Sequence, residues 1–243
     1  MKTQCLLCVF SVVLACCATA VPAGGAASVS KSMALYARDM EFYYQNKRPE
    51  VLPGILRVFD AQGVLADGEK RLATAAFLAE ALRHDASARG RVLPPAASLS
   101  RNARRTLAWT AHLAGFPDEA ALLGQLLDKD DAVLLRQIQE SPVSLARWNI
   151  SESSVLQMYW AAFFAAGKDV WLDAIINAAL RYSRLNAAGL QNNPDYAAGA
   201  AAAASLYETA PRHAAVHARL ESFLKDRTNS AEIDTLLLIL RKK

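Results

Sequence analysis

Apolar side chains recur at intervals of three and four residues along most of this chain, and this periodicity constrains the fold more than any other feature. One such stripe runs from residue 31 to 46, and another follows Asp67. Their members are Met33, Tyr36, Met40, Tyr43 and Tyr44, and then Leu72, Ala75, Ala76, Ala79 and Leu82. An α-helix brings residues at this spacing to one face, whereas a half-buried strand needs apolar and polar residues to alternate. The sequence therefore predicts an all-α fold.

Helix-ending residues divide this pattern into paired segments. Ser100 can cap a helix that ends at Gly115, and Pro117 opens the next helix. The stretch AWTAHLAG (108–115) has a counterpart in YWAAFFAAG (159–167), since each contains a tryptophan, small residues and a final glycine. This recurrence predicts antiparallel helical hairpins, stacked as a bundle or a short α-solenoid.

Further breaks occur in both halves of the chain. Residues 86–99 contain a glycine and two prolines, which predict a long loop and the best place for an internal boundary. Pro194 and Asp195 start an alanine-dense helix, Pro211 separates it from another, and Asn229 caps the last one. We expect a single all-helical domain over residues 31–243.

The N-terminus is typical of an export signal. Lys2 precedes an apolar run over residues 5–16, which is too short to span a membrane, and small residues follow at cleavage spacing. We therefore expect residues 1–20 to form a signal segment and residues 21–30 a flexible tether.

The same segment offers a second processing route. Val13-Leu14-Ala15-Cys16 resembles the bacterial lipobox, in which Cys16 would become the lipid anchor. Release after Ala20 and anchoring at Cys16 both stay open, and an apolar leader that stays attached is the alternative to export. With either processing route, we expect the protein to be exported, and to contact a membrane only through that anchor.

Cysteine and charge content exclude several classes of protein. All four cysteines lie within the first seventeen residues, so no disulfide and no thiolate metal site is expected in the folded body. Hydrophobic residues make up 53% of the chain, enough for an ordinary core. The net charge of +4 is mild, and the cluster of Arg101, Arg104 and Arg105 is interpreted as a solvated helix face. No nucleic-acid partner is expected.

Two histidines form the best metal-ligand pattern. His213 and His217 stand four residues apart on an expected helix, with Glu221 four further on, so that all three would share a face. Ala214 stands where a zinc protease needs its general base, and no third ligand is identifiable, so polar surface histidines are the preferred interpretation.

No other constellation predicts catalysis or a cofactor. The chain lacks a nucleophile turn and a phosphate-cradling glycine loop. His84 and His112 are isolated, and are expected to be cap or surface residues. The acidic cluster of Asp128, Asp130 and Asp131 is expected to support the start of the next helix through its dipole. No catalytic, cofactor-binding or metal-binding residue is predicted.

Aromatic residues gather in the middle of the chain and are expected mainly in the core. Tyr43 and Tyr44 are neighbours, about 100° apart around a helix, so one of them should lie near the surface.

Three stretches resemble a loose group of exported all-helical bacterial proteins that are uncharacterised. They are YYQNKRPEVLPGIL (43–56), AAFLAEAL (75–82) and YWAAFFAAGKDVWLDAII (159–176). The resemblance covers about half of the mature chain. It implies a bacterial envelope setting, in the periplasm or anchored to an envelope membrane, and no particular activity.

These observations favour a non-enzymatic module that binds another protein, as an adaptor, an assembly factor or an inhibitor. A helical hydrolase or metal-dependent enzyme is a second hypothesis, and would need His213 or His217 to meet carboxylates from other helices. A third is a lipid or small-molecule carrier, with a cavity lined by Trp160, Phe163 and Phe164.

Overall fold

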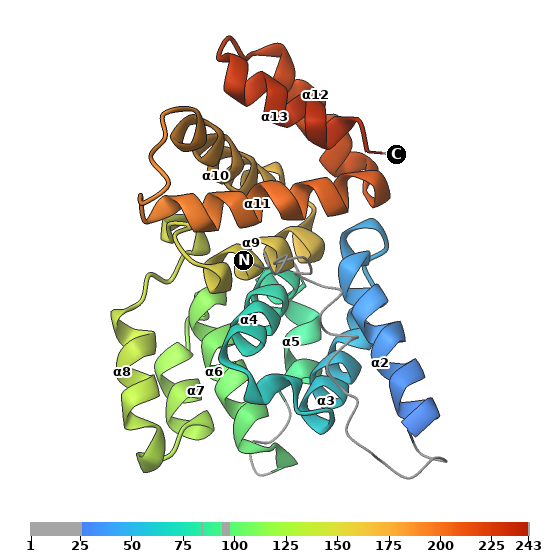
Figure 1. Ribbon diagram of the computed structural model, residues 1–243. Helices are drawn as coiled ribbons and strands as arrows, with labels where there is room; N and C mark the ends of the chain where they lie inside the picture. Colours follow the sequence, from blue (N-terminus) through green and yellow to red (C-terminus); the bar gives the residue numbers. More distant parts are fainter. Residues whose placement is uncertain (1–25, 84, 94–97, 243) are drawn as a thin grey trace. The chain divides into compact units, whose positions relative to one another are not determined.

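The computed structural model describes residues 26–83, 85–93 and 98–242 (Figure 1). Within these ranges every regular element is a helix, and no strand occurs. The all-α prediction is therefore confirmed. None of the helices in the described ranges is both long enough and apolar enough to cross a membrane.

The chain divides into two compact units, each described here by itself. We call residues 20–148 and 157–167 the N-terminal unit, and residues 149–156 and 168–243 the C-terminal unit, a name that leaves out the first nineteen residues. The division passes through helix α9 (Ser153–Ala166). The single domain expected over residues 31–243 stays a prediction.

The N-terminal unit contains seven α-helices in its described residues, besides most of α9. They are α2 (Ala26–Glu41), α3 (Leu52–Ala61), α4 (Gly68–Arg83), α5 (Ala86–Val92), α6 (Arg101–Ala114), α7 (Glu119–Leu126) and α8 (Ala132–Glu140). Short 3-10 turns connect them: η1 (Tyr43–Gln45), η2 (Pro49–Val51), η3 (Val64–Ala66), η5 (Lys129–Asp131) and η6 (Leu145–Arg147). Residues 26–30 of the expected tether belong to α2.

Helices α4 and α6 form the centre of this unit. They lie side by side, with α2 and α3 on one side and α7 and α8 on the other (Figure 1). Residues 73–82 of α4 are all buried, and their alanines let α6 approach closely. The side chain of Glu80 is only 2% exposed and pairs with Arg83. Arg83, which is partly exposed, also donates to the carbonyl of Leu113 on α6 and so links the two central helices.

The expected long loop over residues 86–99 is partly wrong, because α5 occupies Ala86–Val92. Asp85 caps this short helix, and its carboxylate accepts hydrogen bonds from the backbone N–H of Ser87 at 3.0 Å and of Ala88 at 3.2 Å. Two satisfied N–H groups at the first turn stabilise a helix despite the glycine near its end.

The two ends of α6 confirm the predicted capping residues. The Ser100 hydroxyl accepts from the N–H of Ala103 at 3.1 Å, and Gly115 ends α6 with a φ of +65°. A left-handed residue at this place lets the chain reverse while the last carbonyls of the helix stay hydrogen-bonded.

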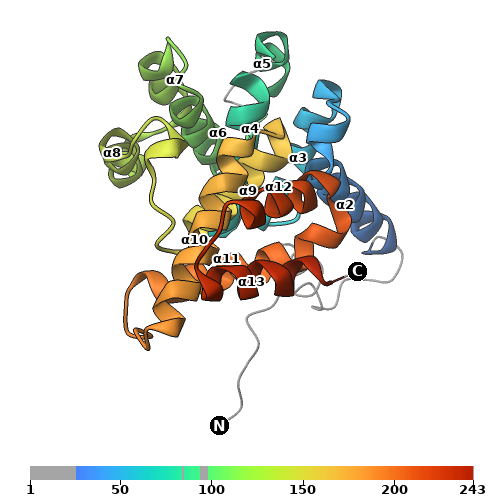
Figure 2. The same cartoon turned by 90° about the horizontal axis from the view of Figure 1, so that it is seen from above.

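The C-terminal unit contains α10 (Asp169–Ala187), α11 (Asp195–Thr209), η7 (Ala210–Arg212), α12 (Ala214–Lys225) and α13 (Ser230–Leu240). Helix α11 lies beside α10 and α13 (Figure 2). A Cβ atom placed on Gly199 would stand 2.7 Å from the Cβ of Tyr182 and 2.8 Å from the carbonyl oxygen of Ala178. The small residues of α11 thus allow close packing against α10.

Ion pairs fasten α12 and α13 to α10. Arg219 donates to both carboxylate oxygens of Asp173, at 2.6 and 2.7 Å. Glu232 is almost fully buried and lies between Arg184 and Arg227. Such bidentate and shared pairs fix the angle at which a helix docks.

Candidate functional site

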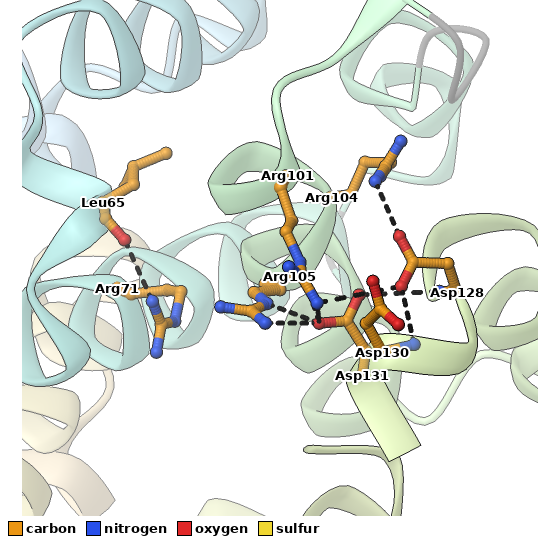
Figure 3. A network of polar contacts seen from close by, with 8 residues as sticks. All are labelled: Leu65, Arg71, Arg101, Arg104, Arg105, Asp128, Asp130 and Asp131. Carbon is orange, nitrogen blue, oxygen red and sulfur yellow. Dashed lines mark hydrogen bonds and ion pairs between the residues drawn. The ribbon is translucent and has the colours of Figure 1, made fainter. Parts of the chain in front are cut away.

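The densest polar network among the described residues joins the start of α6 to η5, the turn between α7 and α8 (Figure 3). Arg101, Arg104 and Arg105 lie on one face of α6, because residues three and four apart are neighbours on a helix. This face is turned toward Asp128 and Asp131. The arginines, expected on a solvated face, are therefore engaged in ion pairs.

Asp131 is the centre of this network. Its side chain is 1% exposed, and one oxygen accepts from Arg101 Nη2 at 3.0 Å and from Arg105 Nε at 2.7 Å. Burial alone would raise the pKa of Asp131, but the hydrogen bonds from Arg105 and Arg101 outweigh it and hold the pKa below its ordinary value. The carboxylate therefore stays charged and anchors η5 to α6.

Asp128 holds the outer part of the same turn. Its carboxylate accepts from Arg104 Nη2 at 3.2 Å and from the backbone N–H of Asp130 at 3.0 Å. Asp131 is in turn the residue that precedes α8. The acidic cluster thus supports the start of a helix, as predicted, and also pairs with α6, which the sequence did not indicate.

Arg71 of α4 lies next to this network. Its Nη1 donates to the carbonyl of Leu65 at 3.1 Å. Burial, and then the nearby positive charge of Arg105, lower the pKa of Arg71 from its ordinary value.

The start of α7 and the end of α8 both contact His112, which lies near the end of α6. This side chain was expected to be a cap or surface residue, but it is only 3% exposed. Its Nδ1 lies 2.7 Å from Glu119 Oε1 at the start of α7, and its Nε2 lies 3.0 Å from the carbonyl oxygen of Ser141, just after α8. The imidazole therefore joins three helices, and the surface expectation for it is wrong.

Together these contacts define what we call the α7–α8 hairpin, residues 119–140. Its closed end, η5, is fixed to the start of α6 by Asp128 and Asp131. Its open end is fixed to the end of α6 by His112. Few apolar residues take part, since only Leu123 and Leu126 of α7 and Ile138 of α8 are buried.

The two histidines of the metal hypothesis are not brought together. His213 is fully buried, so the surface position expected for it is wrong, and it precedes α12 in an extended conformation, with a φ of −129°. His217 is 41% exposed, and its Nδ1 lies 3.7 Å from Glu221. The expected shared face does not form, because η7 ends at Arg212 and α12 begins only at Ala214.

Within the described ranges no group of three or more His, Cys, Asp or Glu side chains could hold a metal ion. His84, Cys16, the signal segment and residues 21–25 of the tether lie outside the described residues.

The aromatic residues of α9 proposed to line a cavity are buried against one another. Trp160 stacks on Phe164 with ring centroids 5.5 Å apart, and Phe163 meets Trp160 edge-on at 6.0 Å. Of the neighbouring tyrosines, Tyr43 is buried against Phe77, and Tyr44 is half-buried over Phe163. The prediction that one of the two lies nearer the surface is confirmed.

Comparison of this chain with protein-family models, with curated proteins and with solved structures finds no match. The resemblance to exported all-helical bacterial proteins therefore stays a prediction, and the function has to be argued from the geometry of the chain itself.

Sequence reasoning missed three polar residues of the N-terminal unit: Arg71, Glu80 and His112. Each lies on a central helix; Arg71 and His112 have partners on other elements, whereas Glu80 pairs with Arg83 of its own helix. One signal was present for Glu80, since Arg83 follows at the i,i+3 spacing of a helical ion pair. For His112 the partners stand 7 and 29 residues away, and no local pattern indicates them.

Proposed function

We propose that this protein is an exported, non-enzymatic interaction module of the cell envelope, which binds another protein as an adaptor, assembly factor or inhibitor. The observation that carries the proposal is the α7–α8 hairpin. It is fastened to α6 by polar contacts at both ends, and it leaves apolar side chains in contact with solvent.

The hairpin exposes small and apolar residues on both of its helices, beside polar residues such as Gln125 and Arg136. Val133 of α8 is 72% exposed, the highest value among the large apolar side chains of the described residues. Leu134 and Leu135 are partly exposed, and Ala120, Ala121 and Gly124 of α7 are exposed. Apolar side chains on a rigid support are suited to binding a protein, because little conformational entropy is lost when the partner docks.

A photo-crosslinking amino acid placed at Val133, in cells that make the protein, tests this proposal. We expect a defined adduct with another protein. The matched control is Leu238 on α13, which is 62% exposed and lies in the C-terminal unit. The purified Val133→Asp variant should then lose affinity for the partner identified in this way, with an unchanged circular dichroism spectrum. The proposal is wrong if residues 133 and 238 give the same adducts, or if neither gives any.

Export is part of the same proposal and has its own measurement. Intact mass spectrometry of the mature protein should give either a lipid-modified chain that starts at Cys16 or an unmodified chain that starts at Val21. The first result would place the protein at an envelope membrane and the second in the periplasm. A chain that retains residues 1–20 would contradict export.

A further inference from the structure

Arg71 differs from the other arginines beside η5, because no carboxylate of the described residues lies within ion-pair distance of it. The single hydrogen bond from its guanidinium to a described residue is the one from Nη1 to the carbonyl of Leu65. Its Nε is buried and has no acceptor in the same ranges. Gly68 has no side chain that could cover the guanidinium of Arg71. Even a Cβ atom at this position would stand 3.8 Å from Nη2.

Part of the guanidinium of Arg105 faces the guanidinium of Arg71 (Figure 3). Its Nε and Nη2 are both used by one oxygen of Asp131, while its Nη1 makes no hydrogen bond to a described residue. In Figure 3 the guanidinium of Arg105 lies between that of Arg71 and the carboxylate of Asp131. Two positively charged forks from α4 and α6 thus come close, with Asp131 on one side of them.

The ion pairs leave this cluster with surplus positive charge. Arg71, Arg101, Arg104 and Arg105 are four cations, but only Asp128 and Asp131 lie within ion-pair distance of them in the described part of the chain. Asp67 caps α4 and lies 3.8 Å from Lys70, and Asp130 is exposed. Four cations thus lie beside two carboxylates in contact, and Arg71 alone among the four has no carboxylate of its own in the described ranges.

Partial burial makes this surplus unfavourable without a ligand. The Arg105 side chain is 26% exposed, and Arg71 is half-buried. Both are shielded from much of the water that would stabilise their charges, yet each is open enough for a small ion to reach it. A bound anion would replace the missing water and relieve the repulsion between the two cations.

We propose that Arg71 and Arg105 bind one doubly charged oxyanion, a phosphate or sulfate group. Guanidinium groups donate parallel hydrogen bonds to two oxygens of such an anion, and two forks from different helices can hold it on two sides. The group is either a free ion or a monoester on a larger molecule. This inference goes beyond the protein-binding proposal and does not depend on it.

Thermal unfolding of the purified protein in increasing inorganic phosphate tests the site, with sodium chloride at matched ionic strength as the reference. A ligand that binds only the folded state stabilises it by RT ln(1 + L/Kd), where L is the free ligand concentration, so the Tm keeps rising with the logarithm of the ligand concentration above Kd. We expect the Tm to rise in this way in phosphate and in sulfate, and not in chloride. Phosphorus NMR line broadening gives the affinity independently of stability.

Three variants decide whether the site is the one proposed. Arg71→Gln should weaken phosphate binding at least tenfold, as expected for the loss of a charged hydrogen-bonding group. Arg71→Lys, which keeps the charge and loses the fork, should bind with intermediate affinity. Arg136→Gln is the matched control, because Arg136 is exposed on α8 and has no ion pair in the described ranges. It should bind as the unmodified protein does.

A comparison of phenyl phosphate with inorganic phosphate distinguishes the two sources of the anion, a monoester and a free ion. Tighter binding of phenyl phosphate identifies an esterified group as the ligand, and tighter binding of inorganic phosphate identifies the free ion. The proposal is overturned if the unmodified protein shows no saturable binding of phosphate or sulfate, or if both Arg71 variants bind as tightly as Arg136→Gln.

Discussion

Single residues decide the stability of this protein at places where a neighbouring helix leaves no spare volume. Gly199 is such a place, since the backbone of α10 occupies the position that a side chain would need. Gly124 of α7 is the opposite case, because nothing lies within 4 Å of the Cβ that it lacks. The pair separates the effect of packing from the effect of helix propensity.

We expect Gly199→Ala to lower the free energy of unfolding by about 1 to 3 kcal/mol, because the methyl group forces α10 and α11 apart. This loss exceeds the gain of about 1 kcal/mol that alanine brings to a helix interior. Gly124→Ala should show that gain alone and stabilise the protein by up to about 1 kcal/mol. Urea denaturation measures both, and equal effects of the two substitutions would contradict the close packing at Gly199.

Asp131 makes stability depend on pH at the acidic end of the range. Its pKa in the folded protein lies below the ordinary 3.8. Between these two values the unfolded chain binds a proton that the folded chain does not. Stability should therefore be complete above the ordinary pKa, and fall as the pH is lowered through this interval.

We expect Asp131→Asn to lower the free energy of unfolding at pH 7 by about 1 to 3 kcal/mol, because Arg101 and Arg105 lose a charged acceptor. It should also flatten the acid dependence of stability. Asp130→Asn, one residue away and exposed, is the control and should change stability by less than about 0.5 kcal/mol. Urea unfolding between pH 3 and pH 7 measures both effects, and an acid slope that persists in Asp131→Asn would show that other carboxylates cause it.

At the scale of elements, the α7–α8 hairpin is held more by polar anchors than by a core. Three buried apolar side chains cannot by themselves fix two helices, since each contributes only about 1.5 to 3 kcal/mol. The contacts of His112 at one end and of Asp131 at the other complete the attachment. Loss of either anchor should therefore loosen the hairpin without unfolding the central helices.

We expect His112→Leu to speed amide hydrogen exchange in α7 and α8, while exchange in α4 stays slow. Leucine fills much of the volume of the imidazole but cannot bind Glu119 or the carbonyl of Ser141. His217→Leu on α12 is the control, because His217 is 41% exposed and not part of the hairpin. Uniformly faster exchange across the N-terminal unit would mean that His112 supports the whole unit and not the hairpin alone.

At the scale of the whole molecule, the folded body depends on burial and ion pairs and not on covalent links. Every cysteine precedes residue 18, so residues 18–243 cannot form a disulfide. A chain of 243 residues can bury enough apolar surface to fold without one.

We therefore expect the Tm of the purified protein to stay the same within about 1 °C when a reducing agent is added, since loss of a native disulfide would cost about 2 to 5 kcal/mol. A chain with serine at positions 5, 8, 16 and 17 should unfold at the same temperature. Scanning calorimetry measures both, and a clear fall in Tm under reducing conditions would show that the N-terminal cysteines stabilise the fold.

The sequence by itself determined the helices and most of their ends. Spacing of apolar residues, Ser100, Gly115 and Asn229 act within one or two turns of the chain, so their effect can be recognised locally. The same locality explains why α5 was missed: its glycine and the prolines after it outweighed the single capping aspartate, Asp85.

Only the tertiary structure decided which polar residues matter. Asp131 meets arginines 26 and 30 residues away, and His112 meets a carbonyl 29 residues away. The interaction of Arg71 with Arg105 likewise depends on how α4 packs against α6. Charge and hydrogen bonding act through space, so a side chain that looks solvated in the sequence becomes an anchor, or a candidate anion ligand, once helix packing has brought its neighbours to it.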